Sequence, residues 1–137
     1  YLALFGADHF WIELQNHLLP GDDALLDELV ALARRLGLGY VATNNVHYLR
    51  REDHRLHDLL LAIKHNRPLD DLEHLLRGNS EFYLQDGRQL RRRFRRYPEA
   101  LSNSVLIAQS CHFRLQQGVQ VLPSFPQPPH SDAPGHL

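Results

Sequence analysis

Apolar residues follow two different periods over the first third of the chain. Residues 10–15 (FWIELQ) are a short aromatic and aliphatic run before the turn-like sequence LLPGDD, which is typical of a strand. Apolar side chains then recur every three to four residues, which predicts a helix through Arg35 with Asp22 or Asp23 as its cap. Residues 40–43 (YVAT) predict a second, buried strand.

The order strand, helix, strand predicts a parallel βαβ unit. Gly37 lies at the expected end of the helix, and the crossover between parallel strands is right-handed in nearly all proteins. Ligands of such sheets gather beyond the carboxyl ends of the strands. Residues 44–47 (NNVH) therefore occupy the end of the sheet where chemistry is expected.

Helical patterns dominate the rest of the folded region. Residues 51–65 place Leu56, Leu59, Leu60 and Ile63 on one helix face, and Pro68 interrupts this helix. A short extended segment is expected at residues 82–84. Three further helices are expected at residues 69–78, 87–97 and 98–111.

A proline-rich tail follows. From Gly118 onward the sequence contains five of its eight prolines, which is typical of an extended linker. We therefore divide the chain into a folded region, residues 1–115, and a linker, residues 116–137.

Composition is that of an ordinary globular protein. The apolar fraction is 43%, and 15 basic against 16 acidic residues leave a net charge of −1, so any attraction for nucleic acid must be local. The single cysteine, Cys111, excludes an internal disulfide and fits a reducing, cytoplasmic location. No apolar run approaches the roughly 18 residues that span a bilayer, so no membrane partner is expected. The abrupt start without methionine leads us to expect a segment of a longer protein.

Asn45 and His47 form the first candidate site. Alternate residues of an extended segment share a face, so both side chains can point the same way just past the second strand. An aspartate at position 45 would complete a pair suited to zinc or manganese, whereas the amide oxygen of Asn45 is a weak ligand. The alternative is a loop asparagine that caps the next turn beside a surface histidine.

His57 and Asp58 lie on the following helix, and His54 lies one turn earlier. This spacing suits a metal or pH-linked cluster that supports the Asn45–His47 site. In the alternative, His57 and Asp58 are hydrogen-bonded at the base of the loop and His54 is solvated. Glu13, within the first predicted strand, is either a site carboxylate or an outward-facing strand residue.

The densest charge cluster is the run of six arginines between residues 88 and 96. Three apolar residues at helical spacing are expected to form the buried stripe of this helix and to leave the arginines exposed: Leu90, Phe94 and Tyr97. Such a basic face either binds phosphates or is simply solvated. The candidate nucleic-acid contacts are Arg91, Arg92 and Arg95.

The run VATNNVHYLRREDHRLHDLLLAI, at residues 41–63, resembles the last metal-motif region of the PHP domain in bacterial DNA polymerase III alpha subunits. Four further pieces follow the order of that family: FGADHFWIELQNH, SEFYLQDGRQL, YPEALSNSVLIAQSC and VLPSFP. The resemblance extends from Phe5 to Pro126. Asn45 corresponds to a metal-binding aspartate of the family. The sequence ATNNVHY around Asn45 resembles the motif of the family's error-prone branch. The earlier metal ligands and the palm aspartates of the family have no counterpart in this chain.

The resemblance implies an α/β fold, namely the second half of a distorted seven-stranded β/α barrel, followed by a helical region and the linker. It implies a parent DNA-directed DNA polymerase of replication or damage tolerance, which uses Mg²⁺, dNTPs, DNA and further polymerase or translesion subunits. Within this parent the segment is expected to be mainly structural and inactive by itself. The alternatives are a metal-dependent phosphoesterase or 3′–5′ exonuclease half-site and an interaction module whose arginine helix contacts DNA or another subunit. An unpaired strand edge is expected to favour self-association.

Overall fold

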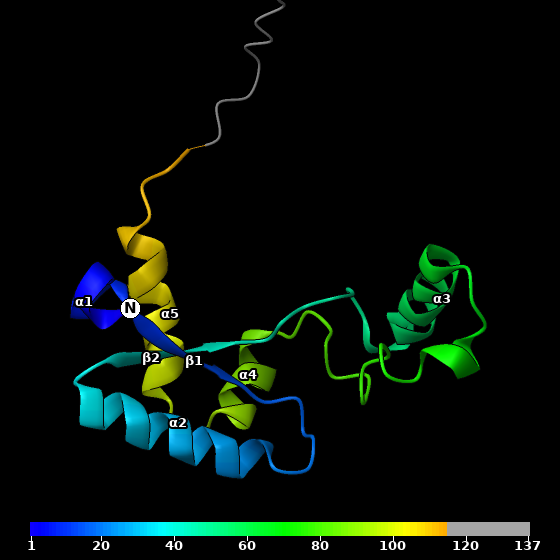
Figure 1. The fold of residues 1–137 in the computed structure, drawn as a ribbon. Helices are drawn as coiled ribbons and strands as arrows, with labels where there is room; N and C mark the ends of the chain where they lie inside the picture. The colour runs from blue at the N-terminus through cyan, green and yellow to red at the C-terminus, as the bar shows by residue number, and fades with distance from the viewer. Residues whose placement is uncertain (115–137) are drawn as a thin grey trace, which may run out of the picture.

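Two short parallel strands organise the part of the chain that the computed structural model describes, residues 1–114 (Figure 1). β1 (Trp11–Gln15) pairs with β2 (Gly39–Thr43) in register along its whole length. Helix α2 (Asp22–Leu36) connects the two strands, so the predicted parallel βαβ unit is confirmed. Residues 1–114 contain these two strands alone, so they do not display the seven-stranded barrel that the resemblance implies.

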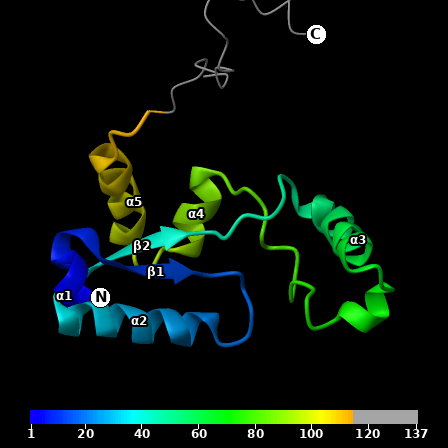
Figure 2. The same ribbon diagram turned by 45° about the horizontal axis from the view of Figure 1, so that its top comes forward.

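Helix α2 covers one side of the sheet (Figure 2), and the side chains that it turns towards the sheet are buried. Leu26, Val30 and Ala33 follow each other at helical spacing, and each is at most 4% exposed. Gly37 has a φ of 66°, and this left-handed turn lets the Leu38 N–H donate to the Ala33 carbonyl oxygen. The predicted end of the helix is therefore confirmed.

The start of α2 differs from the prediction. Gly21, not an aspartate, holds the N-cap position, with a φ of 92°. The Asp22 carboxylate accepts a hydrogen bond from the His17 N–H, and Asp23 accepts one from the Asn16 side-chain amide. Asp22 thus supplies an acceptor for backbone N–H groups of the loop after β1, and Asp23 holds the Asn16 side chain of the same loop.

Helices α4 (Gly87–Arg93) and α5 (Glu99–Ser110) lie on the other side of the strands from α2 (Figure 2). Phe94, directly after α4, is 1% exposed and belongs to the same core as Leu14 of β1. Leu90 and Tyr97 pack against this core, which confirms the predicted apolar stripe. The core therefore forms from both sides of the two-stranded sheet.

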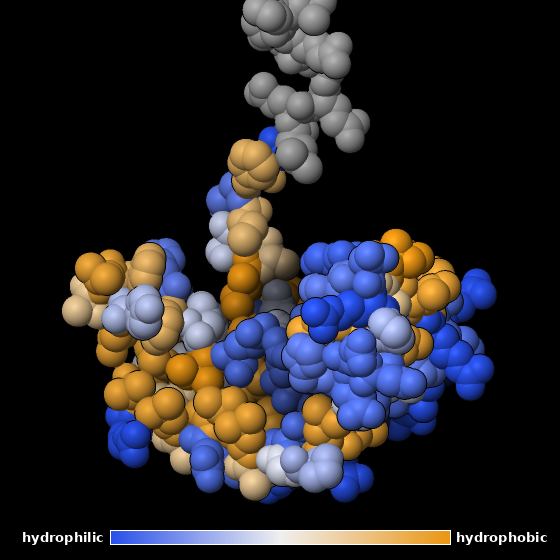
Figure 3. All heavy atoms as spheres, turned by 45° about the vertical axis from the view of Figure 1, so that its right-hand side comes forward, coloured by the Kyte–Doolittle hydropathy of each residue, from blue (hydrophilic) through white to orange (hydrophobic). Residues whose placement is uncertain are grey.

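The segment around helix α3 (His54–His65) extends away from this core (Figure 1). The space-filling view shows hydrophobic and hydrophilic residues side by side on the face turned to the viewer (Figure 3). A 3-10 turn, Arg51–Asp53, precedes α3, and a second one, Leu69–Leu72, stands where a short helix was predicted. The predicted apolar face of α3 is present but is exposed, with Leu56, Leu59, Leu60 and Ile63 between 51% and 66% accessible.

Two short helices, α1 (Leu2–Phe5) and the 3-10 turn Ala7–His9, precede β1. No helix within residues 1–114 is both long enough and apolar enough to cross a membrane. The predicted linker, residues 116–137, lies outside the described residues.

Candidate functional site at the carboxyl end of the sheet

The segment after β2 is held in place by a distant part of the chain. The buried side-chain amide of Asn44 donates to the Tyr83 carbonyl oxygen at 2.6 Å. The His47 N–H donates to the Phe82 carbonyl oxygen at 2.8 Å, and Tyr48 pairs with Tyr83 in a parallel bridge. The extended segment predicted at residues 82–84 therefore fixes the backbone on either side of His47.

His17 reaches the same place from the end of β1. The residue is 6% exposed, and its ring stacks on Phe82 with 3.9 Å between the ring centroids. Its Nε2 atom is buried and has no hydrogen-bond partner in the described structure. Burial lowers the pKa of His17 below 6.5, although the Asp22 carboxylate opposes this effect. The sequence could have indicated His17, because β1 ends at the same edge of the sheet as β2.

Arg77 makes the decisive contact with His47. A guanidinium NH₂ group of Arg77 lies 2.6 Å from His47 Nε2, and the guanidinium also sits over the Phe82 ring, 5.1 Å from its centroid. Arginine has only donors, so Nε2 is the unprotonated acceptor in this contact. Burial lowers the pKa of His47, and the positive charge of Arg77 lowers it further.

Asn45 and His47 do not make a zinc or manganese site by themselves within residues 1–114. Arg77 occupies the Nε2 lone pair of His47, and Asn45 is exposed with a φ of 25°. Within residues 1–114 no group of three His, Cys, Asp or Glu side chains is placed to hold a metal ion. A catalytic zinc site needs three protein ligands, and the arrangement does not provide them.

His57 lies beside His47, with 5.3 Å between the ring centroids. Its Nδ1 atom is 3.6 Å from an Asp58 carboxylate oxygen and is buried without a hydrogen-bond partner among the described residues. His57 and Asp58 are thus adjacent, as predicted, but at ion-pair rather than hydrogen-bond distance. His54 has a different partner: its Nδ1 atom lies 3.1 Å from the Arg51 carbonyl oxygen.

Arg93 corrects the prediction that all six arginines face solvent. Its side chain is 9% exposed and contacts the Glu81 carboxylate at 2.5 Å and the Asn16 carbonyl oxygen at 3.0 Å. Arg51 contacts the other oxygen of the buried Glu81 at 2.7 Å. Arg93 connects α4 to the loop that carries His17. Arg51 and Arg93 together supply the positive charge that the buried Glu81 carboxylate requires. An acid directly before the apolar pair Phe82–Tyr83 was the available signal.

The remaining candidates lie on the surface. Arg91, Arg92 and Arg95 are exposed, as predicted, and line a shared recess. Glu13 is exposed and accepts a hydrogen bond from the Thr43 hydroxyl, which agrees with the outward-facing alternative.

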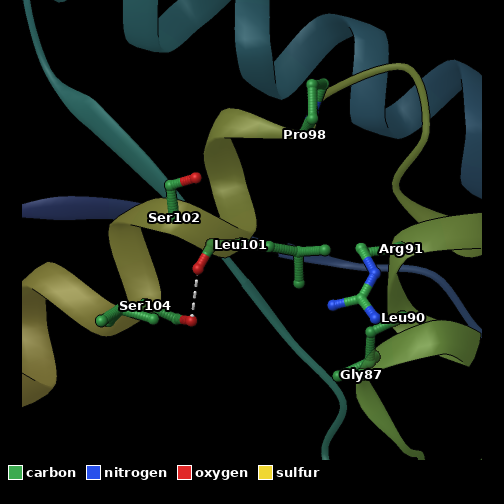
Figure 4. Close-up of a pocket in the computed structure, with 8 residues that line it drawn as sticks. Gly87, Leu90, Arg91, Pro98, Leu101, Ser102 and Ser104 are labelled. Atoms are coloured by element: carbon green, nitrogen blue, oxygen red, sulfur yellow. Dashed lines mark hydrogen bonds between the residues drawn. The ribbon is translucent and has the colours of Figure 1, made fainter.

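A recess of about 570 Å³ lies between α4 and α5 (Figure 4). Leu90 and Arg91 line it from α4, and Pro98 and Leu101 line it from the α5 side. Its lining contains no carboxylate or imidazole that could act as an acid or base for the hydroxyls of Ser102 and Ser104.

The described residues form an α/β unit. A cluster of histidines lies at the carboxyl end of its parallel strands, and Arg77 contacts His47 of this cluster. No family model matches the chain. It is 40% identical over 130 residues to the DNA polymerase III subunit alpha of Treponema pallidum and 41% identical over 136 residues to that of Thermus aquaticus. It is also 35% identical over 128 residues to the error-prone DNA polymerase of Nocardia farcinica.

These similarities cover 93–95% of this chain and 11% of each relative. The chain thus matches DNA polymerase III alpha subunits and error-prone DNA polymerases over most of its length, and it spans about a ninth of them.

Proposed function

We propose that the chain is a segment of a bacterial DNA polymerase III alpha-type subunit, the second half of its PHP domain, and that its role there is structural. The observation that carries this proposal is the sequence identity of 40–41% between nearly the whole chain and two alpha subunits. The βαβ unit with His47 beyond β2 is compatible with one part of a larger β/α barrel.

In this proposal the parent protein extends primers with dNTPs on a DNA template. Two Mg²⁺ ions held by carboxylates outside this chain align and neutralise the transferring phosphate. DNA, dNTPs and other polymerase or translesion subunits are the parent's partners, and the parent acts in the cytoplasm in replication or damage tolerance. Asn45 favours the error-prone branch, whereas the identities to alpha subunits and to error-prone polymerases do not separate the branches.

The structural role rests on the contact between Arg77 and His47. A guanidinium supplies a fixed positive charge beside an unprotonated imidazole, in a place where metal-bearing relatives are expected to hold a cation. The phosphoesterase or exonuclease alternative needs a metal to activate water, and the residues described here do not fit one.

Primer extension tests the parentage. The complete reading frame that contains this segment is expected to extend a primer with Mg²⁺ and dNTPs, and the 137-residue chain alone is expected to be inactive. The parent with its palm carboxylates replaced is the control for contaminating polymerase. A parent that lacks primer extension, or a lone chain that performs it, would refute the proposal.

Calorimetric titration with zinc tests the structural role. We expect no tight, stoichiometric binding by the chain, because Asn45 is a poor ligand and Arg77 covers His47. Tight binding that disappears in His47→Ala would favour the phosphoesterase alternative.

A further inference from the structure

The arginines around α4 are of two kinds. Arg93 pairs with the buried Glu81, and Arg96 pairs with Asp27 at 2.7 Å. The other four make no ion pair and no side-chain hydrogen bond within residues 1–114: Arg88, Arg91, Arg92 and Arg95. These four, hereafter the arginine face, therefore carry uncompensated positive charge.

The arginine face occupies one side of a helical turn. Its members follow one another at intervals of three, one and three residues, which is the spacing of a single helix face. All four are exposed, and together they are the residues that line a recess of about 530 Å³. Phe94 and Leu90 anchor the opposite side of the turn in the core.

The acid next to the arginine face does not neutralise it. The Asp86 carboxylate accepts hydrogen bonds at 2.8 Å from the backbone N–H groups of Arg88 and Gln89, as the cap of α4. The backbone N–H of Gln89 and the neighbouring arginine charges lower the pKa of Asp86, so it stays ionised. One negative charge engaged with the backbone is set against four guanidinium groups.

We propose that the arginine face binds the phosphate backbone of duplex DNA. Guanidinium groups bind phosphates in a bidentate manner, and the net charge of −1 means that the attraction must arise from this local face. From Arg88 to Arg92, both within α4, the helical rise is about 6 Å, an axial length over which duplex DNA presents roughly three to four phosphates, and Arg95 follows in the turn after the helix. The choice of DNA among polyanions rests on the proposed polymerase parentage.

Duplex binding by the 137-residue chain, measured by fluorescence anisotropy over a series of salt concentrations, tests this proposal. The double variant Arg91→Gln/Arg92→Gln is expected to bind about tenfold more weakly at low ionic strength. Its plot of log affinity against log salt is expected to flatten by about 1 for each lost phosphate contact.

The matched control is Arg35→Gln/Arg55→Gln, which removes the same charge from two exposed arginines on α2 and α3. We expect affinity within about twofold of the unaltered chain, since these arginines lie away from the proposed face. The variant Arg91→Lys/Arg92→Lys keeps the charge and is expected to retain most of the salt dependence. It also keeps the test valid if the glutamine variant fails to fold.

Three results would overturn the proposal. The first is the absence of salt-dependent duplex binding by the unaltered chain. The second is an equal loss of affinity in the control variant, which would indicate overall charge rather than this face. The third is displacement of the duplex by tripolyphosphate at equal phosphate concentration, which would indicate a small polyphosphate ligand. None of these results bears on primer extension by the parent, so the two proposals can fail separately.

Discussion

Helices α2 and α3 present similar apolar stripes to very different surroundings. Val30 and Ala33 of α2 are 2% and 0% exposed, because the strands cover them. Leu60 and Ile63 of α3 are 55% and 66% exposed, and no element of residues 1–114 covers their stripe. An amphipathic helix can therefore form although nothing within the described residues covers its apolar stripe.

The two regions are also held by different forces. The βαβ unit with α4 and α5 has a core of aliphatic and aromatic side chains around Leu14 and Phe94. The region around α3 is joined to it through a small aromatic cluster of Tyr48, Phe82 and Tyr83, through hydrogen bonds such as that from Asn44 to Tyr83, and through the Glu81 ion pairs. Truncations in the core should therefore cost far more than truncations on α3.

The largest effect is expected for Phe94→Ala. Phe94 is 1% exposed and lies between the sheet and α5, so its removal leaves a cavity that should lower the free energy of unfolding by about 4 kcal/mol. Urea unfolding of the 137-residue chain measures this change. A loss below about 1 kcal/mol would contradict the core described here.

Arg93→Ala should follow at about 3 kcal/mol, because it leaves the buried carboxylate of Glu81 with the more exposed Arg51 as its remaining cation. Arg95→Ala is the matched control, two residues along the chain and exposed, with a change expected within about 0.5 kcal/mol. Urea unfolding of both variants decides the matter. Equal losses would show that the Glu81 network does not join the two regions.

A smaller effect is expected from pH through His17. Its folded-state pKa lies below the value of 6.5 expected for the unfolded chain, chiefly because of burial. Well above pH 6.5 the His17 imidazole is neutral in both the folded and the unfolded chain, so its protonation does not reduce stability. As the pH falls, the unfolded chain binds a proton at His17 before the folded chain does. Stability should therefore decrease until the pH passes the folded-state pKa, and His47, whose pKa is also lowered, acts in the same direction.

Thermal unfolding at about pH 7.5 and about pH 5.5 measures this decrease. His17→Gln should reduce the difference between the two midpoints, whereas His65→Gln, at the exposed end of α3, should leave it as in the unaltered chain. An unchanged difference in His17→Gln would show that the burial of this imidazole does not govern the response.

The sequence predicted local features well and distant contacts poorly. The strands, α2 with its end at Gly37, the buried Phe94 and the position of His47 beyond β2 all follow from local pattern and strand order. Arg77 lies 30 residues from His47, and Arg93 lies 12 from Glu81; the place of Glu81 before an apolar pair indicates a buried acid, but neither local pattern identifies the partner. The aspartates at the start of α2 were assigned as caps, but the loop before the helix competes for the same carboxylates.

The smallest effect is expected for Leu60→Gln on α3. Glutamine has nearly the helix propensity of leucine, and Leu60 is 55% exposed, so the free energy of unfolding should change by less than about 0.5 kcal/mol. Unfolding should be measured at several protein concentrations, because a second copy of the chain is one surface that can cover α3. If Leu60→Gln is costly and the midpoint of the unaltered chain rises with concentration, this stripe is buried by self-association. The contrast between α2 and α3 would then hold for the single chain but not for the assembly.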